Sequence, residues 1–316
     1  MSGRTCLVTG GGGFIGSHLV DALLERGDTV RVLDDWSNGN AANLDSGNSR
    51  LDVVSGDIRD PDCVSRCASA CDVVFHQAAL GSVPRSLADP GRTHDVNVNG
   101  SFTVFQAAWA AKVPRVVFAS SSSVYGDHPG LPKVEENLGV PLSPYAASKR
   151  ATEIEAAGMA RAYGMVFVGL RYFNVFGPRQ RADSPYAAVI PLFFQAALRG
   201  LSPRIHGDGA QSRDFTFVSD VVTANLLAAE APLPAGGAPV FNVSRGQRVT
   251  INELWQAVAK ETNTGAKPEH VAPRPGDVLH SLASLDAARR DLSYEPRIAL
   301  TEGLARSARF YRGLPG

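Results

Sequence analysis

A tyrosine and a lysine four residues apart form the pattern that most directly indicates chemistry in this sequence. Tyr145 and Lys149 follow Ser143-Pro144, a pair typical of a helix start, so both side chains are expected on one helical face. A phenol with a pKa of about 10 is a poor base at neutral pH, but a neighbouring ammonium favours its ionised form. The same spacing also arises by chance in ordinary helices, so the pair needs supporting signals.

A run of serines precedes this pair. Residues 118–127 read FASSSSVYGD, which is a strand that ends in four serines. Open α/β sheets bind ligands at the carboxyl ends of their strands, so a serine hydroxyl there can share a substrate proton with Tyr145. Without the Tyr–Lys pair, a serine-rich turn would be the ordinary interpretation.

A glycine cluster near the N-terminus indicates a dinucleotide site. Residues 5–16 read TCLVTGGGGFIG, and Gly10, Gly13 and Gly16 allow a tight turn and a close approach of the backbone to a pyrophosphate. Asp34 ends the next strand, where a carboxylate accepts hydrogen bonds from the adenosine ribose and repels a 2′-phosphate. The pattern therefore favours NAD over NADP.

The elements that must position these residues alternate along the first half of the chain. Five β-branched runs are predicted to be buried parallel strands, and amphipathic stretches lie between them: the runs are TCLVTG, TVRVLDD, LDVVSGD, DVVFHQAA and RVVFASSS. A sixth strand, MVFVGLRYFNVFG, follows the helix that begins near Tyr145. This order predicts an α/β doubly wound parallel sheet. We expect a dinucleotide-binding domain over residues 1–176 and a smaller, mainly substrate-binding lobe over residues 177–316, interwoven with the first.

Composition narrows the class of protein. The 316 residues carry 31 Lys and Arg against 31 Asp and Glu, so no general attraction to nucleic acid or to an anionic membrane is expected. No long apolar run or signal peptide is evident, which favours a cytoplasmic protein. The even spacing of Cys63, Cys67 and Cys71 invites a metal site, but packing as small apolar residues fits better, and no metal is predicted.

Several motifs together resemble one known family. TGGGGFIG, VLDD, HQAALGSVPRS, SSSSVYG, SPYAASK and RYFNVFGPRQ are similar to an extended short-chain dehydrogenase/reductase of the nucleotide-sugar epimerase/dehydratase type. The likeness covers nearly the whole chain. HQAALGSVPRS, YAAVIP and PGDVLHS look most like UDP-hexose 4-epimerases that act on UDP-N-acetylglucosamine. The resemblance implies a Rossmann-type sheet with bound NAD.

The resemblance also implies roles for individual residues. Ser121 takes the place of the catalytic hydroxyl, Tyr145 that of the base and Lys149 that of its electrostatic partner. The residues that it places around NAD, besides the glycines, Tyr145 and Lys149, are Phe14, Ile15, Asp34, Asp57, Ile58, Ala78, Asn97 and Phe173. Asp57 also suits an ordinary strand end, and Asn97 an ordinary polar position inside a helix.

The nucleotide sugar needs localised cations, because the net charge supplies none. The residues that the resemblance places on the substrate are Ser82, Ser122, Ser123, Asn174, Arg213, Arg274, Asp277 and Ser281. Asn174 and both arginines would hold the diphosphate, Asp277 the uridine ribose, and Ser122 and Ser123 would line the sugar pocket. A surface salt bridge is the ordinary alternative for any one arginine.

Two departures from the family are informative. Dehydratases carry Asp-Glu beside the catalytic hydroxyl, whereas Ser122 and Ser123 stand here, so the proton carrier for dehydration or decarboxylation is absent. Ser281 aligns with a bulky tyrosine of epimerases restricted to UDP-glucose and UDP-galactose. A small serine leaves room for an N-acetyl group without excluding UDP-glucose.

The hypothesis is a UDP-sugar 4-epimerase that removes hydride from C4 and returns it to the opposite face. A UDP-glucuronate 4-epimerase stays open, because Arg85 or the serine run could hold a carboxylate. A non-catalytic NAD-binding sensor is a third alternative, which would not need Tyr145, Lys149 and Ser121. By analogy we expect a homodimer through residues 93–111 and 144–163, where Phe102, Phe105 and Trp109 form an apolar face unless they pack against their own sheet.

Overall fold

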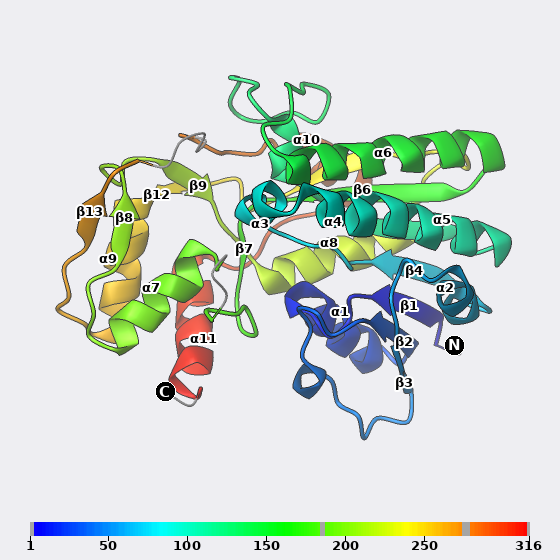
Figure 1. Ribbon diagram of the computed structural model, residues 1–316, viewed down its shortest axis with the longest axis horizontal. Coiled ribbons are helices and arrows are strands. Elements are labelled where there is room, and N and C mark those ends of the chain that lie inside the picture. Colours follow the sequence, from blue (N-terminus) through cyan, green and yellow to red (C-terminus); the bar gives the residue numbers. More distant parts are fainter. Residues whose placement is uncertain (1–2, 184–186, 274–278, 315–316) are drawn as a thin grey trace.

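One parallel β-sheet organises the computed structural model, which describes residues 3–183, 187–273 and 279–314 (Figure 1). Its strand order is β11-β6-β5-β4-β1-β2-β3, and every neighbouring pair is parallel. The strands are β1 (Thr5–Thr9), β2 (Thr29–Asp34), β3 (Leu51–Ser55), β4 (Val73–His76), β5 (Arg115–Ser121), β6 (Val166–Tyr172) and β11 (Val240–Val243). The chain runs outward from β1 to β3 and then returns to β4, so the strand order reverses between β1 and β4. Ligands bind at such a reversal in open α/β sheets.

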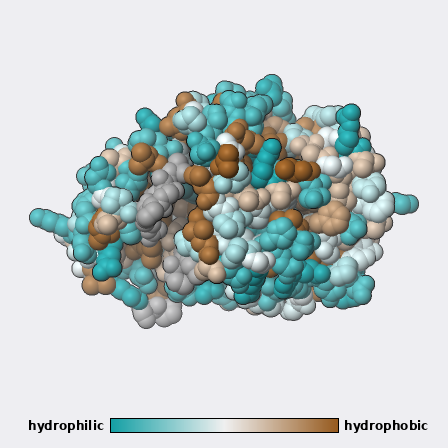
Figure 2. Space-filling model, turned by 45° about the horizontal axis from the view of Figure 1, so that its top comes forward, coloured by the Kyte–Doolittle hydropathy of each residue, from teal (hydrophilic) through white to brown (hydrophobic). Residues whose placement is uncertain are grey.

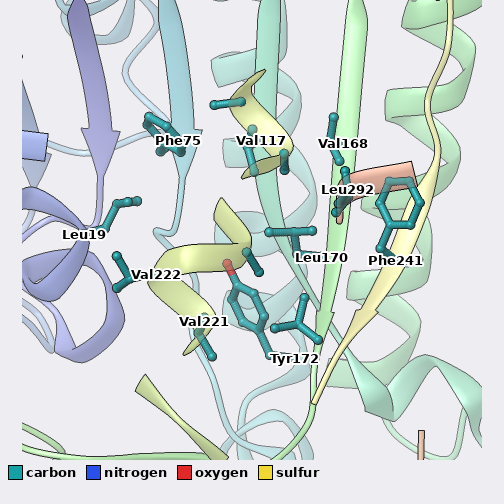
Figure 3. Close-up of a cluster of buried hydrophobic side chains, with 14 of the residues drawn as sticks. Leu19, Phe75, Val117, Val168, Leu170, Tyr172, Val221, Val222, Phe241 and Leu292 are labelled. Atoms are coloured by element: carbon teal, nitrogen blue, oxygen red, sulfur yellow. The ribbon is translucent and has the colours of Figure 1, made fainter. Parts of the chain in front are cut away.

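Helices cover both faces of the sheet because successive strand residues point to opposite sides. Cys6 and Val8 of β1 join the core on one face, whereas Leu7 joins the core on the other. The helices on the first face are α1 (Phe14–Glu25), α8 (Val218–Glu230) and α10 (Asp286–Leu292), and those on the second are α2 (Pro61–Ala68), α5 (Ser101–Ala110) and α6 (Pro144–Tyr163). Figure 3 shows side chains of the first core converging from neighbouring strands and from α1, α8 and α10. The predicted doubly wound α/β fold is confirmed.

Two strand predictions need correction. Residues 51–55 were expected to be buried, but β3 is the last strand of the sheet and Val53 is 40% exposed, because an edge strand is covered less completely. The stretch MVFVGLRYFNVFG does not form one strand. It divides into β6 and a short β7 (Val175–Phe176), and between them Asn174 has a φ of +34°.

The part of the chain after residue 176 contributes to two regions. Strand β11 and helices α8 and α10 belong to the layers of the main sheet. The other helices, α7 (Val189–Leu198), α9 (Ile251–Thr262) and α11 (Leu300–Arg312), pack around a separate core (Figure 1). Short strand pairs complete this lobe: β7 with β10 (Thr216–Phe217), β8 (Arg204–His206) with β13 (Glu269–Val271), and β9 (Ser212–Asp214) with β12 (Arg248–Thr250).

The segment between β4 and β5 is helical but not continuous. It contains α3 (Val83–Ala88), α4 (Pro90–His94), a π-helical turn η2 (Asp95–Gly100) and α5. Such π-helical turns occur frequently at functional sites. Across the described residues, none of the helices combines the length and apolar character needed to cross a membrane.

The three evenly spaced cysteines pack in the interior. Cys63 and Cys67 lie on the buried side of α2, and Cys71 is buried just before β4. Burial raises the pKa of the Cys67 thiol to about 11, so this group is a neutral thiol at physiological pH. The prediction that these residues act as small apolar side chains is confirmed.

Local sequence sets the start and end of α6. The Ser143 Oγ accepts a hydrogen bond of 3.1 Å from the Ala146 N–H, and Pro144 occupies the first helical position. Gly164 ends the helix with a φ of +74°, a conformation that glycine adopts without strain. The cap therefore fixes the helical turn that carries Tyr145.

The Ser143 cap is expected to stabilise the fold. Ser143→Ala removes the acceptor for the Ala146 N–H and should lower the free energy of unfolding by about 1 kcal/mol, measured by urea denaturation. Ser143→Asp retains an oxygen acceptor and is the matched control. Equal losses in both variants would show that the cap hydrogen bond is not the cause.

Candidate active site

A large cleft opens at the carboxyl ends of the strands. Its volume is about 1230 Å³, and its lining includes the loops that follow β1, β2, β3 and β4 together with the first turns of α6. A second hollow of about 630 Å³ lies toward the lobe. The two share the lining residues Ala187, Gln195 and Arg199, so they adjoin. The cleft coincides with the reversal of strand order.

The glycine loop forms one wall of this cleft by close backbone packing. A Cβ on Gly16 would lie 2.1 Å from the Gly10 carbonyl oxygen, and a Cβ on Gly10 would lie 2.7 Å from the Ala78 Cα. Gly13, at the N-cap of α1, makes no side-chain cap hydrogen bond, so the first N–H groups of α1 are suited to an anion. The predicted Gly10, Gly13, Phe14, Ile15 and Gly16 all line the cleft, as a dinucleotide diphosphate requires.

Asp34 lies at the end of β2 on the same cleft. Its Oδ2 accepts the Gly12 N–H at 2.9 Å and its Oδ1 accepts the Trp36 N–H at 2.9 Å. Burial raises the pKa of this carboxyl, and the two backbone donors oppose that shift. The donors also fix the orientation of the carboxylate, which suits an acceptor for ribose hydroxyls.

The remaining predicted cofactor residues divide between the cleft and its supports. Asp57, Ile58 and Ala78 line the cleft. Arg59 binds both carboxylate oxygens of Asp57, and these hydrogen bonds lower the pKa of Asp57. Phe173 is completely buried in the core, so its role toward NAD stays a prediction.

Asn97 supports the cleft from behind. Its side chain accepts the Leu80 N–H at 2.8 Å and donates to the Leu80 carbonyl at 3.2 Å and to the Ser148 hydroxyl at 3.0 Å. Because Leu80 lines the cleft and Ser148 belongs to α6, this buried amide connects the loop after β4 to the helix of Tyr145. These contacts place it as a positioning residue.

His76 forms a second buried support that sequence reasoning missed. The Ser101 hydroxyl donates its proton to the Asn97 carbonyl, so Ser101 must accept a hydrogen bond from His76 Nε2. On the other side of the ring, Thr9 Oγ1 accepts the Ala78 N–H and lies 2.7 Å from His76 Nδ1. These directions assign the neutral Nε2–H form. Burial, with a smaller effect of Lys149, lowers the pKa of His76 to about 3. Thus the ring connects Thr9 of β1 to Ser101 at the start of α5 without a charge.

The catalytic residues predicted from sequence come together. Tyr145 lies in the first turn of α6, beside the last residue of β5, Ser121. Burial raises the pKa of Tyr145, whereas a hydrogen bond from the Ser121 side chain lowers it. Ser121 also accepts the Ser123 N–H at 3.1 Å, which holds its hydroxyl in place.

Lys149 lies one turn further along α6 and lines the cleft. Its Nζ donates to the Ala119 carbonyl of β5 at 2.8 Å. Burial lowers the pKa of Lys149 to about 8, and the nearby Glu153 carboxylate opposes that shift. The ammonium is thus anchored to the sheet, and the expected pairing with the Tyr145 phenol stays a prediction.

Two of the residues predicted to bind substrate lie at the second hollow. Asn174 and Arg213 both line it. The Asn174 amide donates to the Asp214 carbonyl at 3.1 Å, and its left-handed backbone conformation is uncommon for a residue other than glycine. Arg213 donates to the Ser212 and Leu279 carbonyls at 3.0 Å and 3.2 Å.

The other predicted substrate residues are located by their elements and hydrogen bonds rather than by the lining of the second hollow. Ser281 is buried against β9, where its N–H donates to the Ser212 carbonyl at 3.1 Å, so it neighbours Arg213. Ser82 caps α3 by accepting the Arg85 N–H at 3.2 Å. Ser122 and Ser123 form the turn that follows β5. Arg274 and Asp277 lie outside the described residues.

Arginines other than those predicted to hold the diphosphate line the cleft. Arg85 Nη1 donates to Asn38 Oδ1 at 3.0 Å and so connects the walls formed by α3 and by the loop after β2. Arg179 follows β7 and Arg199 follows α7. Arg179 lies within the motif RYFNVFGPRQ and could have been found there, whereas Arg199 has no local sequence signal.

Comparisons with known proteins agree with this geometry. A model described as the NAD dependent epimerase/dehydratase family matches residues 6–244. A UDP-glucose 4-epimerase of Mycolicibacterium smegmatis is 41% identical over 310 residues, covering 97% of this chain and 98% of that protein. The structure of a UDP-N-acetylglucosamine 4-epimerase from Methanobrevibacter ruminantium in complex with UDP-N-acetylmuramic acid is 40% identical, with a TM-score of 0.94 and 99% of both chains covered. A Thermus thermophilus UDP-glucose 4-epimerase in complex with NAD is 34% identical, with a TM-score of 0.89, and covers 98% of this chain and 99% of its own.

The neutral His76 should make stability depend on pH. Its pKa is 6.5 in the unfolded chain and about 3 in the fold, so the unfolded state binds more protons between these values and stability falls as pH falls through this window. Between pH 7 and pH 5 this group should remove about 2 kcal/mol from the free energy of unfolding. His76→Gln should lose that part of the pH dependence in urea denaturation. Parallel curves for the two proteins across this range would contradict the assignment.

Proposed function

The chain belongs to the NAD-dependent epimerase/dehydratase family, and on that basis we propose that it is a UDP-sugar 4-epimerase, an isomerase that inverts C4 of a UDP-hexose. One observation carries this proposal: Tyr145, bonded to Ser121, lines the dinucleotide cleft together with Lys149, and this cleft adjoins the hollow that holds Asn174 and Arg213. A sugar attached to a diphosphate in that hollow would reach Tyr145 and the cofactor together.

The chain's own residues handle the proton and the orientation. Bound NAD supplies the acceptor, and later the donor, of the C4 hydride. Tyr145 removes the O4 proton, and Ser121 orients the hydroxyl. Because burial raises the pKa of Tyr145, its phenolate needs positive charge nearby, and Lys149 is the cation that the next turn of α6 supplies.

The substrate class follows from charge and pocket size. Asn174 and Arg213 are suited to a diphosphate, which needs localised donors in a chain with no net charge. Ser281, beside Arg213, is the small residue that leaves room for an N-acetyl group. The relatives' names include both UDP-glucose and UDP-N-acetylglucosamine 4-epimerases, and we propose that this chain acts on both pairs of sugars.

The two alternatives are less well supported. A UDP-glucuronate 4-epimerase would need a partner for the C6 carboxylate, but the Arg85 guanidinium donates to Asn38 in the loop after β2. A non-catalytic NAD sensor would have no use for the hydrogen-bonded Ser121 and Tyr145 beside the anchored Lys149.

A product assay tests the proposal directly. The protein, with no added NAD, should convert UDP-N-acetylglucosamine into UDP-N-acetylgalactosamine, resolved by NMR. Tyr145→Phe should lower kcat by about 10² to 10⁴-fold while NAD stays bound, because it removes the proton acceptor only. Tyr163→Phe, which changes an exposed tyrosine of the same helix, is the control.

The outcomes separate the candidates. Turnover of UDP-glucuronate alone would establish the first alternative, and bound NAD without turnover of any nucleotide sugar would establish the sensor. Full activity in Tyr145→Phe would remove Tyr145 as the base.

We also keep the homodimer and the cytoplasmic location expected from the sequence as proposals. The outer faces of α5 and α6 expose Phe102, Trp109, Ile154 and Tyr163, and the Trp109 and Tyr163 rings lie 4.5 Å apart. Figure 2, which brings this side of the molecule forward, shows hydrophobic side chains among hydrophilic ones. Phe105, expected on the same face, instead packs inward against Phe118 and Phe167. A second copy presenting the same two helices would cover the exposed rings in a four-helix bundle.

A charge on this face should separate the copies. Ile154 is 58% exposed, so Ile154→Glu should fold normally but sediment as a monomer at micromolar concentration, because a carboxylate would be buried between the subunits. Val53→Glu, on the exposed edge strand, should leave the assembly unchanged. A monomeric parent protein would contradict the homodimer.

A further inference from the structure

A buried ion pair lies directly behind the residues proposed to be catalytic. Arg171, on β6, is 1% exposed, and the Glu153 side chain, on α6, is 3% exposed. Arg171 Nε donates to Glu153 Oε1 at 2.8 Å and Nη2 donates to Oε2 at 2.9 Å. Two parallel hydrogen bonds between a guanidinium and a carboxylate fix the relative position of their elements. The proposed catalytic mechanism and the two alternative functions give this pair no role.

Further hydrogen bonds connect the pair to the end of β5. The Ser120 hydroxyl donates to Glu153 Oε1 at 2.6 Å, and Arg150 Nη1 donates to Oε2 at 2.9 Å. Arg171 is held from its other side, because its Nη1 donates to the Tyr125 hydroxyl at 3.1 Å and to the Glu135 carbonyl at 2.8 Å. Ser120 and Arg171 are directly opposite in the register of β5 and β6. Glu153 therefore bridges α6 to two neighbouring strands.

The positions along α6 relate this bridge to the active site. Tyr145, Lys149 and Glu153 follow one another at intervals of four residues and share one helical face. They contact three consecutive residues of β5: Tyr145 bonds Ser121, Lys149 bonds the Ala119 carbonyl, and Glu153 bonds Ser120. We propose that Glu153 is a positioning residue, which aligns α6 along β5 through Arg171 and Ser120 and holds the charge of the Lys149 ammonium.

The charges around Lys149 support this role. From its own helix Lys149 faces Glu153, and from β4 it faces His76, which is neutral. The Arg171 guanidinium, from β6, and the Arg150 guanidinium, from α6, both bind Glu153. Glu153 is the carboxylate that raises the pKa of Lys149 against the effect of burial. Without it, the effect of burial on the pKa of Lys149 would be unopposed by Glu153, so the ammonium would lose its proton at lower pH.

Glu153→Gln tests the charge. The chain has five lysines, so ¹³C-lysine NMR of the NAD-bound protein resolves Lys149, assigned by Lys149→Met. We expect the pKa of Lys149 to fall from about 8 by about one unit. Loss of the ammonium should then lower kcat about fivefold at pH 8 and much less at pH 6.5. KM should stay unchanged, because the Glu153 side chain is buried behind the cleft and does not reach the substrate.

A matched control and a second variant keep the outcome clear. Glu155→Gln changes an exposed carboxyl of the same helix and should leave both the Lys149 pKa and the pH profile as in the parent. Because Glu153→Gln leaves Arg171 buried without its partner, it could unfold the protein; Glu153→Met with Arg171→Met removes both charges and should fold. In that double variant the Lys149 pKa should still fall, because the nearer carboxylate is gone.

Two results would overturn the inference. One is an unchanged Lys149 pKa in Glu153→Gln or in the double variant; the other is a loss of kcat that is the same at every pH, which would indicate a purely structural role. The kinetic part rests on the proposed function, but the NMR titration needs no substrate. If the parent protein turns over no nucleotide sugar, the proposed function fails while the titration still decides the role of Glu153.

Discussion

The docking of α6 along the end of β5 is the constraint on which the rest of the structure depends. Tyr145, Lys149 and Glu153 contact consecutive residues of β5, and the Glu153–Arg171 pair extends this contact to β6. A displacement of one residue along the strand would bury the Glu153 carboxylate without its partners, at a cost of several kcal/mol. The ion pair therefore selects one alignment, and that alignment brings the phenol to the Ser121 hydroxyl.

The cofactor side of the cleft depends on the same kind of close contact, but between backbones. Gly10 and Gly16 leave no room for a Cβ, so the loop after β1, the start of α1 and the strand end at Ala78 meet at main-chain distance. His76 and Asn97, both buried, connect these elements to α5 and to α6. The two walls of the cleft are thus parts of one hydrogen-bonded framework. A neutral His76 adds no further buried cation to that framework.

Much of the fold and of the site could be predicted because its determinants are local. The glycine spacing, Asp34 at a strand end and the Ser143-Pro144 start of α6 each depend on neighbours within a few residues, and each lies where the sequence indicated. The pairing of Glu153 with Arg171 could not be predicted. Their partnership requires β6 to lie beside β5, and the order of strands is set by packing of the whole sheet.

The sequence by itself determined the fold class, the dinucleotide loop and the Tyr145–Lys149 helix, because strand alternation, backbone sterics and helical spacing act within single elements. Tertiary structure alone decided which faces are covered. Phe105 points into the core while Trp109 on the same helix stays exposed, and β3 is left at the edge. It also decided that Asn97 holds Leu80 and that Arg85 reaches Asn38. Burial and long-range hydrogen bonds depend on which elements become neighbours, and no single segment carries that information.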